Sequence, residues 1–157
     1  MTRNKGTPQK LPLAKTPRPL TGLGEALLAV EYGSVREGPN FDIKIETFRK
    51  LTASKETGGS MVQSLRSLGS AALNIAAVAA GQLDMYWEGG CWAWDVCAGW
   101  CILSEAGGKM VSGNAGDWEP EVDGRVYLAV RGAPSGQKEI VEEFWKVLGD
   151  QKMDYRS

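Results

Sequence analysis

The stretch that decides the fold spans residues 71–108 and reads AALNIAAVAAGQLDMYWEGGCWAWDVCAGWCILSEAGG. Its Ala-rich first part, residues 71–80, is typical of a helix buried closely against its neighbours, and Gly81 is a typical stop. Residues 83–87 are predicted to form a buried strand, and residues 94–106 a second helix that ends at Gly107. This alternation of helix, strand and helix predicts a layered α/β fold.

Similar elements alternate on both sides of this stretch. The apolar pattern predicts strands at residues 26–32, 61–65, 109–112 and 125–130. It predicts a helix over residues 41–51, with Asn40 as its N-cap, and a last helix over 137–148. In the first of these helices an apolar stripe is expected to lie on the sheet, formed by Phe41, Ile45, Phe48 and Leu51. We therefore expect an α/β fold, a layered mixed sheet with flanking helices.

The chain has 157 residues, the size of one domain. Residues 1–21 hold five basic side chains, no acidic one and four prolines, so we expect a basic, Pro-rich tail or loop there. Residues 22–149 are expected to form the domain, and residues 150–157 a polar tail. With 18 basic against 19 acidic residues, the chain carries no electrostatic footprint for nucleic acid.

The residue types that are missing exclude several chemistries. Without histidine the chain cannot build a Ser-His-Asp or Cys-His pair, a His-ligated zinc or a His general base. Its cysteines, Cys91, Cys97 and Cys101, lack the spacing of a zinc site, and we expect reduced thiols, with Cys97 and Cys101 facing inward. No secretory segment or run of 18 apolar residues is present, so we expect a cytoplasmic protein without a membrane partner.

Acidic and aromatic side chains cluster between Asp84 and Asp95, around a strand end, a Gly-rich turn and a helix start. In α/β sheets, ligands bind beyond the carboxyl ends of strands and next to helix N-termini, which is the place this cluster occupies. Asp95 is suited either to capping the helix or to ligating a hard cation. Glu88 has the same two interpretations.

Fixed motifs run through the same region. Residues 94–108, WDVCAGWCILSEAGG, resemble the carboxy-terminal signature of the inositol monophosphatase family, W-D-x-[AC]-A-G followed by an apolar helix and E-A-G-G. Residues 65–74 resemble its R-S-x-G-[ST]-A-A-L-N segment, and the segment from Ala80 to Glu88 resembles A-x-G-x-x-D-x-Y-x-E. Residues 30–36 are similar to the strand before its G-S-x-R turn. The resemblance spans residues 22–148.

This resemblance implies the carboxy-terminal half of an αβαβα sugar-phosphatase fold. It also implies a hydrolase of small phosphomonoesters such as inositol phosphates, in which Mg²⁺ activates a water for attack on the phosphate. By motif position, Asp95 would bind the metal and lie near the inositol hydroxyls, and Glu88 would hydrogen-bond one of them. The turn of Gly69, Ser70 and Ala71 would line the substrate, and Ser34 the neighbouring wall. No residue is assigned a catalytic role.

The sequence lacks the G-E-E and D-P-x-D-G-T segments that supply the family's other metal ligands. Because one carboxylate cannot hold two or three Mg²⁺ ions, we expect an inositol-phosphate phosphatase that is truncated and inactive without the missing N-terminal half. The alternative is a non-catalytic homologue that binds or regulates a full-length relative, as a homodimer or with that half. A third interpretation treats the Trp and Gly cluster as core without a ligand. The absent half also predicts uncovered apolar surface and self-association.

Overall fold

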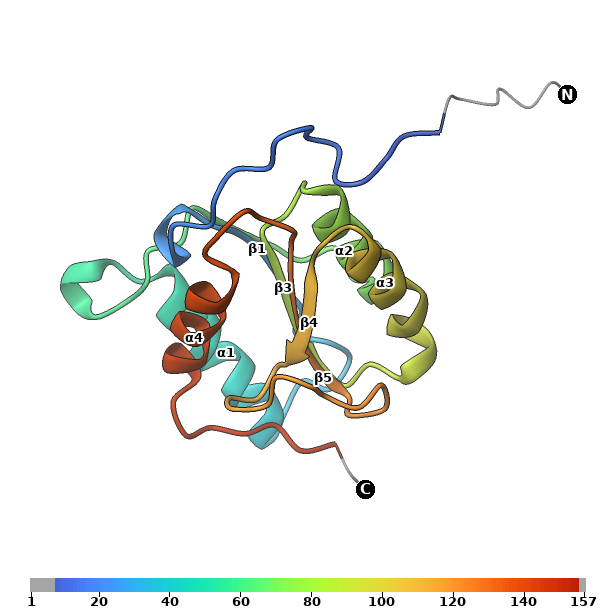
Figure 1. Ribbon diagram of the computed structural model, residues 1–157. Coiled ribbons are helices and arrows are strands. Elements are labelled where there is room, and N and C mark those ends of the chain that lie inside the picture. The colour runs from blue at the N-terminus through green and yellow to red at the C-terminus, as the bar shows by residue number, and fades with distance from the viewer. Residues whose placement is uncertain (1–7, 156–157) are drawn as a thin grey trace, which may run out of the picture.

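The computed structural model describes residues 8–155, which fold into three layers (Figure 1). A five-stranded sheet forms the middle layer. Helices α1 (Pro39–Thr52) and α4 (Gln137–Leu148) cover one face of this sheet, and α2 (Ala71–Ala80) and α3 (Ala93–Glu105) cover the other. Arg3 and Lys5 of the expected basic tail lie outside the described residues.

The sheet is mixed. Its strands are β1 (Leu27–Val30), β2 (Ser64–Arg66), β3 (Met85–Gly89), β4 (Lys109–Ser112) and β5 (Val126–Val130), and their order is β2-β1-β3-β5-β4. Strand β1 pairs in parallel with β2 and β3, whereas β5 is antiparallel to both β3 and β4. The predicted α/β class with a layered mixed sheet and flanking helices is confirmed.

Alternation along the central strands divides the core between the two faces. Trp87 and Leu128 pack towards α1 and α4, whereas Tyr86 and Tyr127 pack towards α2 and α3. All four side chains are fully buried, and the Trp87 indole donates to the Gly113 carbonyl oxygen over 2.9 Å. Successive side chains of a strand point to opposite faces of the sheet, and here both faces carry apolar side chains because helices cover both.

The prediction for the buried face of α1 was wrong at Ile45 and Phe48, although it is confirmed at Leu51, which is fully buried. Ile45 and Phe48 are each 48% exposed, and the buried positions are Lys44, Thr47 and Leu51. The Lys44 side chain is buried because its ammonium group donates to the backbone carbonyl oxygens of Tyr32 and Gly89. A charged side chain therefore occupies a buried position that the apolar pattern had predicted to be exposed.

Three smaller expectations are also corrected. Asn40 lies inside α1, which begins after Gly38, and its amide binds the backbone of Asp154 instead of capping the helix. A strand was expected to begin at Met61, but β2 begins later, at Ser64, and the φ of Met61 is 48°, which is not an extended conformation. The thiols of Cys97 and Cys101 are exposed on α3 rather than buried. The spacing of residues in a helix predicts the angle between their side chains around the helix axis, but it does not predict which side of the helix packs against the sheet.

Both ends of the described chain run along the domain. Between residue 8 and the short 3₁₀ helix Leu23–Glu25, the structure has no regular helix or strand. Buried Leu20 anchors this segment, because its backbone N–H donates to the Ser135 carbonyl oxygen. A second 3₁₀ helix, Lys55–Thr57, follows α1. Residues 150–155, expected as a polar tail, differ: Met153 is only 3% exposed and belongs to the core on the α1–α4 side.

Candidate functional site

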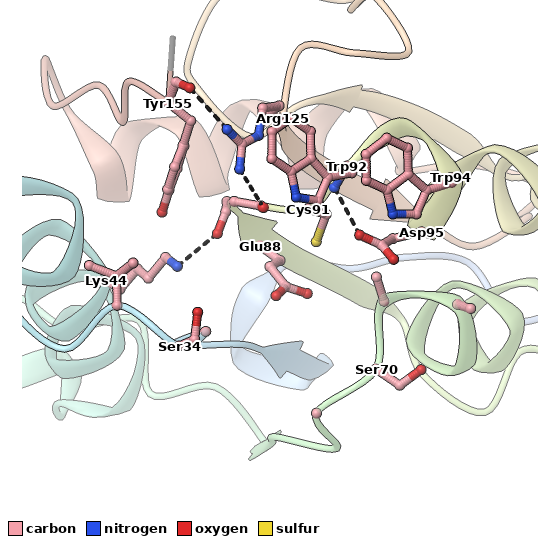
Figure 2. Close-up of a pocket in the computed structure, with 17 residues that line it drawn as sticks. Ser34, Lys44, Ser70, Glu88, Cys91, Trp92, Trp94, Asp95, Arg125 and Tyr155 are labelled. Carbon is pink, nitrogen blue, oxygen red and sulfur yellow. Dashed lines mark hydrogen bonds between the residues drawn. The ribbon is translucent and has the colours of Figure 1, made fainter. Parts of the chain in front are cut away.

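A pocket of about 540 Å³ opens where the three parallel strands end (Figure 2). The segment after β1 contributes residues 33–35, the segment from the end of the turn after β2 into α2 contributes residues 69–72, and the segment from the turn after β3 into α3 contributes residues 90–92, 94 and 95. Because parallel strands end at the same edge of a sheet, segments far apart in the sequence meet there. All six residues predicted to bind substrate line this pocket: Ser34, Gly69, Ser70, Ala71, Glu88 and Asp95.

A buried carboxylate holds the turn in front of α2. Glu31, directly after β1 and 3% exposed, accepts hydrogen bonds from Ser67 Oγ (2.7 Å), Leu68 N (2.6 Å), Gly69 N (2.9 Å) and Asn74 Nδ2 (2.8 Å). Burial alone would raise the pKa of Glu31, but these hydrogen bonds together hold it below its ordinary value. Ser70 then caps α2 by accepting from Leu73 N, so the start of the helix opens on the pocket.

Glu88 lies on the floor of the pocket (Figure 2). Its carboxylate accepts a hydrogen bond from the buried Tyr86 hydroxyl. Burial raises the pKa of Glu88, and the Tyr86 hydrogen bond and the positive charge of Lys44 partly oppose this shift. Beside it, burial raises the pKa of the Cys91 thiol to about 12, so this cysteine is a neutral thiol and not a nucleophile at neutral pH.

Asp95 occupies the first turn of α3 and does cap it. One carboxylate oxygen accepts from Trp92 N over 2.9 Å, and Asp95 N donates to the Trp92 carbonyl oxygen over 3.0 Å. The structural interpretation of Asp95 therefore holds, and the side chain also lines the pocket. A carboxylate needs only one oxygen for this cap, so capping and ligand binding are compatible.

The pocket residues that were not predicted as site residues include Lys44, Arg125 and Tyr155. Lys44 extends from α1 and donates to the carbonyl oxygens of Gly89 (2.8 Å) and Tyr32 (3.2 Å), and burial lowers its pKa. The guanidinium carbon of Arg125 lies 3.7 Å from the Trp92 ring centroid. Tyr155, in the C-terminal segment, also lines the pocket. A lysine within an apolar helix pattern is a weak signal for Lys44, but no local pattern marks the other two.

Aromatic rings form the rim next to α3. Trp92 and Trp94 stack with ring centroids 5.1 Å apart, and Trp94 is 71% exposed. Arg125 underlies Trp92 and donates to the Gly90 carbonyl oxygen over 3.0 Å. The mouth of the pocket is therefore aromatic and cationic, while its floor carries Glu88.

The donor set does not complete a magnesium site. Among residues 8–155, no three His, Cys, Asp or Glu side chains come together in a group that could hold a metal ion. Asp95 can supply a carboxylate oxygen, but Mg²⁺ requires near-octahedral oxygen coordination, usually with more than one protein or substrate ligand. Within the described residues, no helix is long and apolar enough to span a membrane.

Comparison with known proteins identifies the chain's relatives. The model of the inositol monophosphatase family matches residues 2–150. Inositol monophosphatase 2 of Saccharomyces cerevisiae is 55% identical over 133 residues, which cover 82% of this chain and 44% of the yeast protein. The quinic acid degradation cluster protein x of Neurospora crassa is 41% identical over 171 residues, covering 94% of this chain and 49% of that protein.

Solved structures agree with these relatives. The inositol monophosphatase from Anabaena superposes with a TM-score of 0.68 at 30% identity, over 87% of this chain and 48% of the other. The chain thus spans about half the length of the relatives it matches. The match to the family model extends over nearly the whole sequence, and its motifs converge on one pocket. The chain belongs to the inositol monophosphatase family.

Proposed function

We propose that this chain supplies the substrate-facing half of a magnesium-dependent hydrolase of phosphate monoesters, with an inositol phosphate as its substrate. One observation carries the proposal: residues from three separate motifs line the same pocket, at the carboxyl ends of the three parallel strands. The related yeast protein bears the name inositol monophosphatase 2, which supports the choice of substrate.

Each side of the pocket suits one part of such a substrate. Gly69, Ser70 and Ala71 line the pocket at the N-terminus of α2, where the helix dipole favours an anionic or hydroxyl oxygen. Glu88 and Asp95 carry the acceptors for ring hydroxyl groups, and Ser34 completes the facing wall. In the proposed reaction the phosphate is released by attack of water, and the ring oxygen leaves with a proton.

The metal ligands are the part of this function that the described residues do not complete. Asp95 would contribute one ligand to a magnesium ion, and the other carboxylates have to come from a further segment, in the same polypeptide or in another. Since the chain spans about half of its relatives, we propose that the 157 residues alone bind substrate without hydrolysing it.

The outer face of α2 and α3 favours such a further segment. Helix α2 contains no charged residue, yet Leu73 is 65% exposed, and Trp94 and Ile102 on α3 are also exposed. Helices that are apolar all round are typical of an inner layer covered on both sides. We propose that the N-terminal half of a family member covers this face. The same face supports the second candidate, a non-catalytic chain that binds a full-length relative or a second copy of itself.

A further part of the proposal is the compartment. All three cysteines lie within the described residues and are free, and two of them are exposed. Exposed free thiols persist in a reducing compartment, which favours the cytoplasm.

Reconstitution with a separate N-terminal half tests the function. The 157-residue chain is purified alone and after co-expression with the part of yeast inositol monophosphatase 2 that precedes the matched region. Phosphate release from inositol 1-phosphate is then followed with and without Mg²⁺. We expect release only from the co-purified pair with Mg²⁺, and loss of release in Asp95→Asn, whose amide oxygen can still cap α3.

Asp117→Asn is the matched control, because Asp117 accepts from Glu119 N in the loop between β4 and β5 and does not line the pocket. Release by the 157-residue chain alone would overturn the proposed division of the site. A stable pair that never releases phosphate would favour the non-catalytic alternative.

A further inference from the structure

Two asparagine side chains hold the C-terminal segment against the domain. Asn114 Nδ2 donates to the Met153 carbonyl oxygen (2.8 Å), and Met153 N donates to Asn114 Oδ1 (2.9 Å). Asn40 forms the same pair of hydrogen bonds with the backbone of Asp154, at 2.6 and 3.0 Å. A side-chain amide that hydrogen-bonds both the backbone N–H and the backbone C=O of one residue fixes the position of that residue, as pairing with a neighbouring β-strand would.

The next residue is held from a third direction. Arg125 donates from Nη1 to the Tyr155 carbonyl oxygen (3.1 Å) and from Nη2 to the Gly90 carbonyl oxygen (3.0 Å). Its guanidinium thus joins the C-terminal segment to the turn in front of α3. The anchors come from α1, from the loop after β4 and from the residue just before β5, so only the completed fold can place this segment.

These anchors place the Tyr155 ring on the Gly89–Gly90 turn of the pocket (Figure 2). A Cβ atom at Gly89 would lie 2.8 Å from Tyr155 Cε2, and one at Gly90 would lie 3.2 Å from Cε1. The ring therefore needs both glycines in order to lie this close to the backbone. Lys44 Nζ is 5.6 Å from the ring centroid, on the side of the pocket that leads to Glu88.

We propose that Tyr155 is a specificity-determining residue of this pocket, forming the wall against which the hydroxylated ring of the phosphate ester packs. The class of ligand rests on the proposed function; the position of the wall does not. A polyol ring presents C–H groups on its faces and hydroxyl groups at its edge. Tyr155 lines the pocket with its aromatic ring, whose centroid lies 5.6 Å from Lys44 Nζ and 5.4 Å from the Arg125 guanidinium carbon. In the proposal this ring packs against the C–H groups, and Glu88 and Asp95 accept from the hydroxyl groups.

Fluorine-labelled tyrosine in the full 157-residue chain tests this assignment. The chain has four tyrosines, and replacing each with Phe assigns its signal. Tyr86, whose hydroxyl donates to Glu88, reports on occupancy of the pocket independently of Tyr155. On titration with inositol 1-phosphate we expect both signals to shift, and on titration with inorganic phosphate we expect the Tyr155 signal to stay unchanged.

Affinity measurements give the second readout. Tyr155→Ala is expected to weaken binding of inositol 1-phosphate by about fivefold and to leave binding of inorganic phosphate unchanged. Tyr32→Ala is the matched control, since Tyr32 is an exposed tyrosine that does not line this pocket. Thermal unfolding of both variants establishes that they are folded.

The outcomes separate this inference from the proposed function. A shift at Tyr86 without one at Tyr155 overturns the inference and leaves the function standing. Shifts at both tyrosines in a reconstituted protein that releases no phosphate support the inference and count against the function. If inositol 1-phosphate at saturating concentration moves neither signal, the pocket binds no such ester and both are overturned.

Discussion

The Glu31 carboxylate accepts a hydrogen bond from Asn74 Nδ2 over 2.8 Å, although 43 residues separate the two in the sequence. Both side chains are buried, one at the end of β1 and one in the first turn of α2. This contact ties the sheet edge to the helix whose N-terminus opens on the pocket. The shape of the pocket therefore depends on a residue that is not itself among those lining it.

Replacing Glu31 with Gln is expected to lower the free energy of unfolding by about 2–4 kcal/mol at pH 7, because an amide cannot accept from all four donors. The pKa of Glu31 is lowered in the folded state, so its stabilisation is fully present above the unfolded value of about 4.3. It is lost as the pH falls through the folded value. Chemical denaturation should show that the free energy of unfolding of the variant differs less from that of the wild type at pH 3 than at pH 7. As the control, Glu46→Gln, which removes one partner of an exposed ion pair, should leave the unfolding curve nearly unchanged. An equal loss of stability in Glu31→Gln at both pH values would contradict the assignment of a lowered pKa to Glu31.

Lys44→Met is expected to raise the pKa of Glu88 further. The positive charge of Lys44 now lowers that pKa against the larger effect of burial, and methionine removes the charge at similar volume. Carbon NMR of the labelled Glu88 carboxyl, followed through a pH titration, measures the shift. Stability should fall by about 1–3 kcal/mol, because the Gly89 and Tyr32 carbonyl oxygens lose their donor. An unchanged Glu88 titration would show that the two charges do not interact.

Gly89→Ala is expected to displace the C-terminal segment. The new Cβ would lie 2.8 Å from Met153 Cε and from Tyr155 Cε2, and the backbone at Gly89 allows no other direction for it. We expect a loss of about 1–3 kcal/mol and faster removal of the last residues by carboxypeptidase. In a chain ending at Lys152 the same substitution should cost far less. A penalty that persists after this truncation would place the strain elsewhere.

Self-association of the isolated chain should depend on the outer face of α2 and α3. Replacing Leu73 and Trp94 together with Ser removes the most exposed apolar side chains of that face and should shift sedimentation towards the monomer. Val122→Ser serves as the comparison, since Val122 is exposed on a loop after β4. Sedimentation that is the same in all three proteins would mean that another surface mediates association.

Much of the fold follows from local pattern. Helices α2 and α4 and strand β4 have the predicted bounds, because Gly stops and short-range periodicity act within a few residues. The six predicted binding residues meet in one pocket for a related reason: Glu88 lies near the end of β3, the other five follow a strand or lie at the start of a helix, and parallel strands share an edge. Their roles towards a ligand stay predictions.

Other features depended on contacts between residues that are distant in the sequence. Two members of the predicted apolar stripe of α1, Ile45 and Phe48, are exposed, since hydrophobic periodicity takes no account of the carbonyl oxygens that bind the Lys44 ammonium group. Residues 150–155 have the composition of a solvated tail, yet Asn40, Asn114 and Arg125 hold them in place. Family, sheet and pocket position were thus encoded in short motifs. Arg125 and Tyr155 reach that pocket only in the folded chain, because the hydrogen bonds of Arg125 to Gly90 and Tyr155 join segments that are distant in the sequence and that no local pattern relates.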